Sequence, residues 1–375
     1  MSVLLSIPKL LFGNGAVRAL RDQLADLGAR KPLLVTDRGL VACGVFARVL
    51  DTLGGSSAES MRAVFADVPE NPTYEGVDRA AALYRASGCD AVVAVGGGSV
   101  IDTAKLVAVL AGHPGAAQDY VGHSDRITRS TAALVAIPTT AGTGSEASPD
   151  AGLHPSANAP SSGVTSAYIV PRVAICDPEL TLTLPPRLTA ATALDALSHC
   201  IEGYLSSTNS PLVDTLALDG IGRAWAHMTA ATDDGRDLAA RGQLMLAAFA
   251  GGLAISKGLG PAHAIAIAAG DQGLHHGLLS GLGLVATAPL LQHKVAMRYA
   301  DIACALGLAP DGDVASALRQ MMLRLSLPAS LEQMGYRLGS LPRLAGAAAA
   351  SHFNLTSRYR PSAAEYAQMI LEILR

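Results

Sequence analysis

The first half of the chain alternates short, predominantly apolar runs with longer segments in which apolar residues recur every three or four positions. Apolar runs occupy residues 31–37, 89–99 and 130–140, and the segment 74–88 has helical spacing. Strands that are apolar throughout are typical of a parallel sheet that helices cover on both faces. This pattern predicts an α/β domain with a parallel sheet over residues 1–185.

The second half follows a different pattern. From Leu188 onward helical spacing dominates, and β-branched runs almost disappear. Pro185 and Pro186 mark the joint, because proline ends one element and rarely continues it. We therefore predict an all-α domain over residues 186–375. Its clearest predicted helices cover residues 213–228, 239–256 and 313–327.

Composition narrows the class of protein. Only 16% of the 375 residues are charged, the net charge is −3 and no basic run occurs, so no nucleic-acid partner is expected. The five cysteines are scattered without a CxxC pair, which favours a reducing, cytoplasmic location. The apolar N-terminus is interrupted by Pro8 and Lys9, so it predicts a strand rather than a signal peptide. We expect no membrane-spanning helix.

Two glycine-rich loops follow predicted strands. The first, Gly96, Gly97, Gly98 and Ser99, leads into a helix, where backbone amides could approach a diphosphate and the helix N-terminus would favour the anion. The spacing is not GxGxxG, and an ordinary strand-to-helix turn is the alternative. The second loop places hydroxyls where open α/β sheets bind ligands, to contact ribose or phosphate or only to cap turns. Its hydroxyl residues are Thr139, Thr140, Thr143 and Ser145.

Asp37 ends the apolar run at 31–37. An acid at the end of such a strand can accept a hydrogen bond from a ribose 2′-hydroxyl and repel a 2′-phosphate, which favours NAD over NADP. Capping the next turn is the equally common alternative.

A carboxylate and an imidazole lie four residues apart in a segment that otherwise has the composition of a buried helix. Asp195 and His199 therefore share one helix face. A second segment adds His263, His275 and His276. An Asp with three imidazoles suits Fe²⁺ or Zn²⁺. The alternative is a buried ion pair with hydrogen-bonded core histidines.

These segments together resemble the iron-containing (group III) metal-dependent alcohol dehydrogenases, the family that includes lactaldehyde reductase and 1,3-propanediol dehydrogenase. The resemblance spans nearly the whole chain and rests on "FGNGAVRAL", "VTDRGL", "NPTYEGV", "GGGSVIDTAK", "IPTTAGTGSE", "DPELTLTLPP", "ALDALSHCIEGYLS" and "PAHA…HHG". It implies a dehydroquinate synthase-like fold, with a dinucleotide-binding α/β domain, a helical domain, and nicotinamide and metal held in a cleft between them.

The resemblance also implies roles for individual residues. It assigns the metal to four ligands, Asp195, His199, His263 and His276. These residues act in catalysis through the metal that they bind. It assigns the pyrophosphate to the loop at Gly96–Ser99, and we place Asp102, which follows in the same motif, in the cofactor site. Asp37 stands where the family often has the acid that favours NAD.

Three departures from the family pattern stand out. Ile267 occupies a position where the family usually has a histidine near the substrate, so we predict an apolar wall there that admits a substrate bulkier or more apolar than a diol. The stretch to the last ligand is one residue shorter, so His275 competes with His276. The lysine that the family commonly carries near the nicotinamide ribose is absent, and Ser161 or Ser162 stands in its place.

The predicted function is that of an NAD(P)-dependent, divalent-metal-dependent oxidoreductase that interconverts a small primary alcohol and its aldehyde, with hydride passing to or from nicotinamide. NAD is expected ahead of NADP, and the metal is Fe²⁺ or Zn²⁺. A homodimer or larger homo-oligomer is expected. Two alternatives remain: a metal-dependent lyase or polyol-phosphate dehydrogenase of the same fold, and a nucleotide-binding homologue with impaired catalysis.

Overall fold

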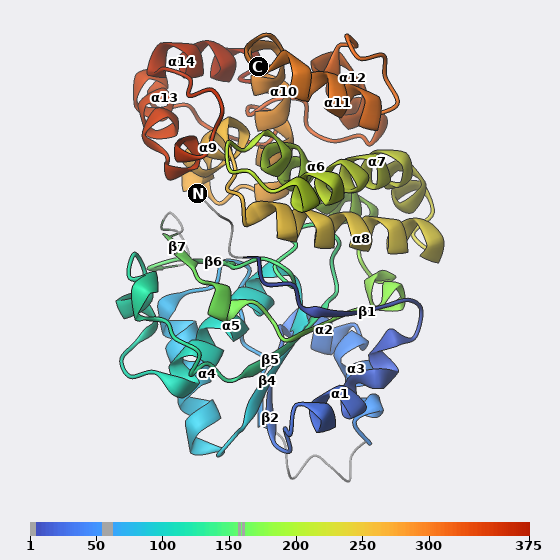
Figure 1. Ribbon diagram of the computed structural model, residues 1–375, viewed down its shortest axis with the longest axis vertical. Coiled ribbons are helices and arrows are strands. Elements are labelled where there is room, and N and C mark those ends of the chain that lie inside the picture. The colour runs from blue at the N-terminus through green and yellow to red at the C-terminus, as the bar shows by residue number, and fades with distance from the viewer. Residues whose placement is uncertain (1–4, 55–62, 157–158, 160–161) are drawn as a thin grey trace. The chain divides into compact units, whose positions relative to one another are not determined.

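The computed structural model describes residues 5–54, 63–156, 159 and 162–375, which separate into two compact units (Figure 1). The sheet unit comprises residues 5–140 and 145–184, and the helical unit comprises residues 141–144 and 185–375 among those described. The independent domains over 1–185 and 186–375 stay a prediction.

Six strands of the sheet unit form a parallel sheet in the order β1-β8-β5-β4-β2-β3, which confirms the predicted α/β class. β6 and β7 form a separate antiparallel pair. The N-terminal strand that the sequence predicts appears as the edge strand β1. The strands are β1 (Lys9–Phe12), β2 (Pro32–Val35), β3 (Ala63–Phe65), β4 (Ala91–Gly96), β5 (Ala133–Pro138), β6 (Asp150–Leu153), β7 (Ser162–Thr165) and β8 (Val173–Cys176).

Helices cover both faces of this sheet (Figure 1). Leu33 and Val35 of β2 pack into one core with α4 and α5, whereas Leu34 packs into a second core with α1 and α3. Alternate residues of a strand point to opposite faces, so both cores draw on the same apolar runs. The helices of this unit are α1 (Leu20–Asp26), α2 (Arg38–Ala42), α3 (Val45–Thr52), α4 (Tyr74–Ala86) and α5 (Gly98–Gly112).

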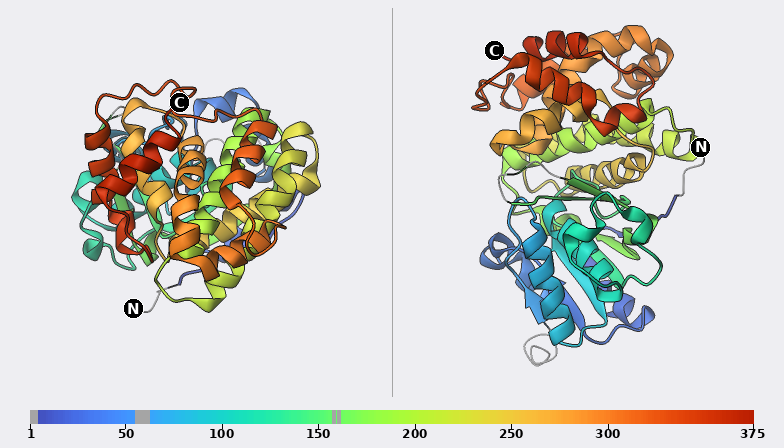
Figure 2. Two further views of the ribbon diagram at one scale, coloured as in Figure 1. Left: turned by 90° about the horizontal axis from the view of Figure 1, so that it is seen from above. Right: turned by 90° about the vertical axis from the view of Figure 1, so that its left-hand side faces the viewer.

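The helical unit is built around α6, which packs against α7, α8 and α10. Figure 2 shows this unit, coloured from yellow-green to red, as a bundle of helices. The helices that the sequence predicts at 213–228, 239–256 and 313–327 appear as α7, α8 and α12. The helices are α6 (Pro186–Leu205), α7 (Pro211–Asp233), α8 (Leu238–Ile255), α9 (Pro261–Ala268), α10 (His276–Lys294), α11 (Ala296–Ala305), α12 (Val314–Arg324), α13 (Leu341–Ala350) and α14 (Ala363–Glu372).

By length and composition, one described helix, α8, is apolar enough to cross a membrane. Within the structure 78% of that segment is buried, as in the core helix of a globular protein. Its apolar character is therefore weak evidence of a membrane span.

Candidate metal centre and cofactor loops

Two predicted ligands lie on α6, the most enclosed helix of the bundle. Its sequence carries small and aliphatic residues on every side, and almost every position from Thr189 onward is buried. Asp195 and His199 are only 3% and 5% exposed, and their nearest ligand atoms, Asp195 Oδ1 and His199 Nε2, are 3.9 Å apart. Burying a carboxylate in an apolar bundle is costly unless a partner compensates it.

The other two predicted ligands come from neighbouring helices of the same unit. His263 lies in the first turn of α9, and its ring stacks on the ring of His199 with centroids 4.8 Å apart. His276 begins α10, and its Nε2 lies 3.9 Å from Asp195 Oδ1. One possible ligand atom from each of the four residues lies within 4.8 Å of all the others. The bundle thus brings together the four residues that the sequence assigns to the metal.

Hydrogen-bonding capacity in this cluster is left unused. Asp195 Oδ1 and His263 Nε2 are buried, and neither has a hydrogen-bond partner among the described residues. Buried polar atoms without a partner are rare in native proteins, and such atoms commonly face a bound ion or water molecule. An Asp oxygen with three imidazole nitrogens is a donor set for Fe²⁺ or Zn²⁺. These residues therefore fit the metal that the sequence predicts.

The electrostatics of the cluster favour the forms that bind metal. Burial lowers the pKa of His199, and it also lowers that of His276, against the raising effect of Asp195 on both. Burial alone would raise the pKa of Asp195, but the surrounding imidazoles together lower it. These shifts favour the neutral forms of His199 and His276 and the carboxylate form of Asp195, which are the states that metal binding requires.

His275 and His276 occupy different positions at the start of α10. His276 belongs to the four-residue group, whereas His275 is the residue that precedes the helix and lies outside that group. Its Nδ1 is buried without a hydrogen-bond partner among the described residues. Geometry thus favours His276 as the fourth ligand, and the assignment stays a prediction.

Ile267 lies in the last turn of α9, four residues after His263, and is partly exposed.

Phe353 is an apolar residue beside the cluster that sequence reasoning missed. The Phe353 ring packs edge-on against the His263 ring, with centroids 5.7 Å apart, and the His352 ring tilts over Phe353 at 4.1 Å. Nothing in the local sequence pattern marks Phe353, because its neighbour on α9 is ninety positions away.

The first glycine loop leads from β4 into α5 as predicted. A Cβ at Gly96 would lie 2.5 Å from Val100 Cγ2, so the turn needs glycine there. Gly97 precedes the helix and has no side chain to cap its first turn, which leaves the N-terminus suited to an anion. Ser99 Oγ instead donates to the Glu70 carbonyl. Pyrophosphate binding by this loop stays a prediction.

Asp102 is engaged in the sheet unit. Its carboxylate accepts hydrogen bonds from Ser145 Oγ and from the Gly152 amide at 2.9 Å, and fully buried Lys105 lies 3.8 Å away. Lys105 Nζ also donates to the Ser148 carbonyl at 3.0 Å. Asp102 therefore ties α5 to the loop after β5 and to β6. Its assignment to the cofactor site remains untested.

The second glycine loop divides between the two units. Thr139 is buried and its amide donates to the Gly96 carbonyl at 3.1 Å, and the Thr140 side chain lies beside Gly97. Thr143 belongs to the segment 141–144, which packs in the helical unit. The threonines at 139 and 140 thus adjoin the first glycine loop, as a shared ligand site requires.

Gly142 and Gly144 have a packing role that sequence reasoning missed. A Cβ at Gly142 would lie 2.7 Å from Thr192 Cβ on α6, and one at Gly144 would lie 2.5 Å from the Ala248 carbonyl oxygen on α8. The Gly142 carbonyl also lies 3.4 Å from His199 Nδ1. These glycines let the loop backbone sit directly on two helices, one of which carries predicted metal ligands.

Asp37 is the last of the predicted cofactor residues, and Ser161 or Ser162 stands where the family commonly has a lysine. Asp37 Oδ1 accepts a hydrogen bond from the Leu40 amide at 2.9 Å, so the residue does cap α2. One carboxylate oxygen makes that bond, which leaves the cofactor role open. Ser162 begins β7, whereas Ser161 lies outside the described residues.

Comparison with known proteins covers both halves of the chain. Residues 8–178 match the family model for iron-containing alcohol dehydrogenase, and residues 189–375 match the C-terminal model of the same family. The chain is 42% identical over 371 residues to 4-hydroxybutyrate dehydrogenase of Cupriavidus necator, covering 95% of each chain.

Two solved structures share the fold over the full length. A 1,3-propanediol oxidoreductase has a TM-score of 0.93 at 28% identity, with 100% of each chain covered. Sulfoacetaldehyde reductase of Bifidobacterium kashiwanohense, solved in complex with NAD⁺, has a TM-score of 0.90 at 26% identity, covering 100% of this chain and 99% of that one.

Proposed function

We propose a specific substrate class, cofactor and metal site for this chain, which belongs to the iron-containing alcohol dehydrogenase family. As a member of that family it is a nicotinamide- and divalent-metal-dependent oxidoreductase that interconverts an alcohol and its aldehyde. The finer assignments are NAD(H), an Fe²⁺ or Zn²⁺ ion on Asp195, His199, His263 and His276, and a short-chain primary alcohol.

The observation that carries this proposal is the four-residue cluster, in which Asp195 Oδ1 and His263 Nε2 are buried with no hydrogen-bond partner among the described residues. A divalent ion held by these residues would supply Lewis acidity toward the alcohol or carbonyl oxygen, and bound nicotinamide would supply hydride transfer. The helices of this unit hold three imidazoles and one carboxylate together around one point. Phe353 packs edge-on against the His263 ring at one side of the cluster.

The alternatives raised by the sequence are not favoured by the relatives, which are named as alcohol or hydroxy-acid dehydrogenases and aldehyde reductases. A steady-state assay with NADH, added Fe²⁺ or Zn²⁺ and a panel of short aldehydes tests the proposal. Metal-dependent oxidation of NADH supports it. Metal binding with no turnover on any aldehyde would instead support the impaired homologue.

The relative in Cupriavidus necator makes 4-hydroxybutyrate the first alcohol to test. 4-Hydroxybutyrate has an acid group at the far end of a short apolar chain. Sulfoacetaldehyde, the aldehyde in the name of the reductase solved with NAD⁺, also has an acid group at its far end. Comparing kcat/KM for 4-hydroxybutyrate, 1-butanol and 1,2-propanediol separates an anionic, an apolar and a diol preference. The apolar side chain of Ile267 predicts that the diol is the poorest of the three.

Asp37 offers a test of cofactor choice. Asp37→Ser keeps a side-chain cap for the Leu40 amide but removes the negative charge. Like charges about 4 Å apart repel by roughly 1 to 4 kcal/mol at a protein surface. We therefore expect the ratio of kcat/KM for NADPH to that for NADH to rise about tenfold. Asp37→Asn, which also caps without charge, should shift the ratio in the same direction. A wild type that prefers NADPH would contradict the assignment.

Ile267 offers a test of proton transfer. An imidazole at 267 would lie one helical turn after His263, where it can exchange a proton with the substrate oxygen through water. We expect Ile267→His to raise kcat about tenfold and to add a titration near neutral pH to the pH–rate profile. Ile267→Gln, polar but without a titration, should leave the profile unchanged. An unchanged profile in the histidine variant would show that residue 267 does not take part in proton transfer.

Oligomeric state and location complete the proposal. We expect a homodimer or larger homo-oligomer, which light scattering coupled to size-exclusion chromatography measures. All five cysteines are free, including buried Cys176 and Cys200, and this supports a reducing, cytoplasmic environment.

A further inference from the structure

Glu202 is a buried carboxylate on α6 that no predicted role accounts for. It is only 1% exposed and follows His199 by three residues, on the same side of the helix. Its two oxygens accept three hydrogen bonds from the start of α9. Oε1 accepts from the Ala262 amide at 2.7 Å, and Oε2 accepts from the His263 amide at 3.0 Å and from His263 Nδ1 at 2.6 Å.

The bond to the imidazole decides which nitrogen of His263 carries the proton. A carboxylate offers only acceptors, so His263 must donate from Nδ1, and in the neutral ring Nε2 then carries the lone pair. That Nε2 is the buried atom without a hydrogen-bond partner in the described part of the chain, and it belongs to the four-residue cluster. Glu202 therefore holds His263 in the tautomer that can bind an ion.

The two amide bonds fix where the helix begins. Gly260 precedes α9 and gives it no side-chain cap, so the first amides of the helix need an acceptor from elsewhere. Glu202 supplies it, and its negative charge meets the positive end of the helix dipole. One side chain thus sets both the position of the α9 backbone and the orientation of the His263 ring.

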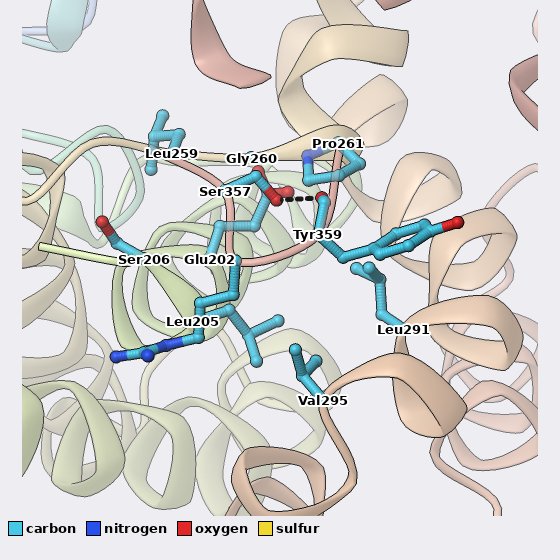
Figure 3. A pocket seen from close by; sticks show the side chains of 11 residues that line it. Glu202, Leu205, Ser206, Leu259, Gly260, Pro261, Leu291, Val295, Ser357 and Tyr359 are labelled. Carbon is cyan, nitrogen blue, oxygen red and sulfur yellow. Dashed lines mark hydrogen bonds between the residues drawn. The ribbon is translucent and has the colours of Figure 1, made fainter. Parts of the chain in front are cut away.

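The surroundings leave little room for this carboxylate to move. A Cβ at Gly260 would lie 2.9 Å from Glu202 Oε1, so glycine permits the close approach. Figure 3 shows Glu202 among the side chains lining a small cavity with Gly260, Pro261 and Ser357. Glu202 thus borders that cavity on one side and bonds to His263 on the other.

We propose that Glu202 is a positioning residue for the metal centre, which fixes the tautomer and orientation of His263 through the Oε2–Nδ1 hydrogen bond. The inference rests on the proposed function, because it assumes that His263 Nε2 binds an ion. Carboxylates that orient metal-binding histidines in this way typically change metal affinity 10- to 100-fold when they are removed.

The test measures metal affinity instead of turnover. Glu202→Gln is titrated with Zn²⁺ against a chromophoric chelator, and its Co²⁺ form is examined by visible absorption, which reports coordination. We expect Zn²⁺ affinity to fall about 10- to 100-fold and the Co²⁺ bands to shift. Gly260→Ala keeps the carboxylate but crowds Oε1. We expect it to weaken Zn²⁺ binding in the same direction, which keeps the proposal testable if the glutamine variant does not fold.

A double-mutant cycle separates positioning from general stability. If Glu202 acts through His263, Glu202→Gln should cause no further loss of affinity in a His263→Ala background. The matched control is Asp214→Asn, which removes a partly buried carboxylate of the same unit that bonds Lys257 and Arg298. It should lower the melting temperature without changing Zn²⁺ affinity.

The outcomes distinguish this inference from the proposed function. Three outcomes would each overturn the positioning role. The first is equal Zn²⁺ affinity in wild type and Glu202→Gln. The others are that Glu202→Gln lowers Zn²⁺ affinity as much in the His263→Ala background as in wild type, or that Asp214→Asn lowers it as much as Glu202→Gln does. A wild-type protein that binds no divalent ion would overturn the proposed function, and the positioning role with it.

Discussion

Replacing His199 with alanine should abolish metal-dependent turnover while the protein stays folded. His199 supplies one of four ligand atoms that lie within 4.8 Å of one another, and no described histidine besides His199, His263 and His276 belongs to that group. Losing a direct ligand should weaken Zn²⁺ binding by more than the roughly 100-fold that loss of a supporting residue can cause. Metal content after dialysis, kcat/KM with added Fe²⁺ or Zn²⁺, and circular dichroism together measure the effect.

The control is His227→Ala, which removes a histidine of α7 in the same unit that lies outside the metal group. It should keep full metal content and turnover. If His199→Ala retains stoichiometric metal and activity, the ion binds elsewhere and the cluster is a set of ordinary core histidines.

Gly144→Ala should destabilise the protein by about 4 kcal/mol, of which overpacking contributes about 3 kcal/mol, the upper end of its usual cost in a core. The added methyl would lie 2.5 Å from the Ala248 carbonyl oxygen on α8, where neither backbone can retreat without moving a helix. Gly144 also has φ of +62°, which adds a conformational cost of roughly 1 kcal/mol for alanine. Denaturant unfolding with two structural probes measures the change in free energy of unfolding.

Gly88→Ala separates the two costs. Gly88 has the same φ of +62°, but nothing lies within 4 Å of the position that its Cβ would take. It should lose only the conformational part, about 1 kcal/mol. Equal losses in the two variants would show that the loop at 141–144 can move away from α8, and that its close packing contributes little.

The α/β fold could be predicted because the strands are apolar on both faces. Leu33, Leu34 and Val35 are all buried, which only a doubly covered sheet explains. Half of the metal cluster could be predicted for a similar reason, since Asp195 and His199 share a helix face by spacing alone. Joining them to His263 and His276 required the family resemblance, because helix packing rather than spacing brings the three helices together.

The residues that sequence reasoning missed show where local patterns fail. Glu202 follows Asp195 by seven positions, so the series 195, 199 and 202 already marks one polar stripe on a buried helix. That signal was present, but it does not distinguish a ligand from a residue that supports one. Gly144 carried no such signal, because its close contact with α8 joins segments about a hundred residues apart, and phosphate-binding loops use glycine equally often.

The packing of residues 141–144 on α6 and α8 bears on how this chain can be divided for protein engineering. The segment lies in the first half of the sequence, yet it fills the surface of helices in the second half. A fragment that starts at residue 186 would carry all four candidate ligands. It would lack the loop at 141–144, so the part of α8 that Gly144 contacts would lose its cover. Exchanging C-terminal halves between homologues therefore requires the donor's own four-residue loop, transplanted with the helices it covers.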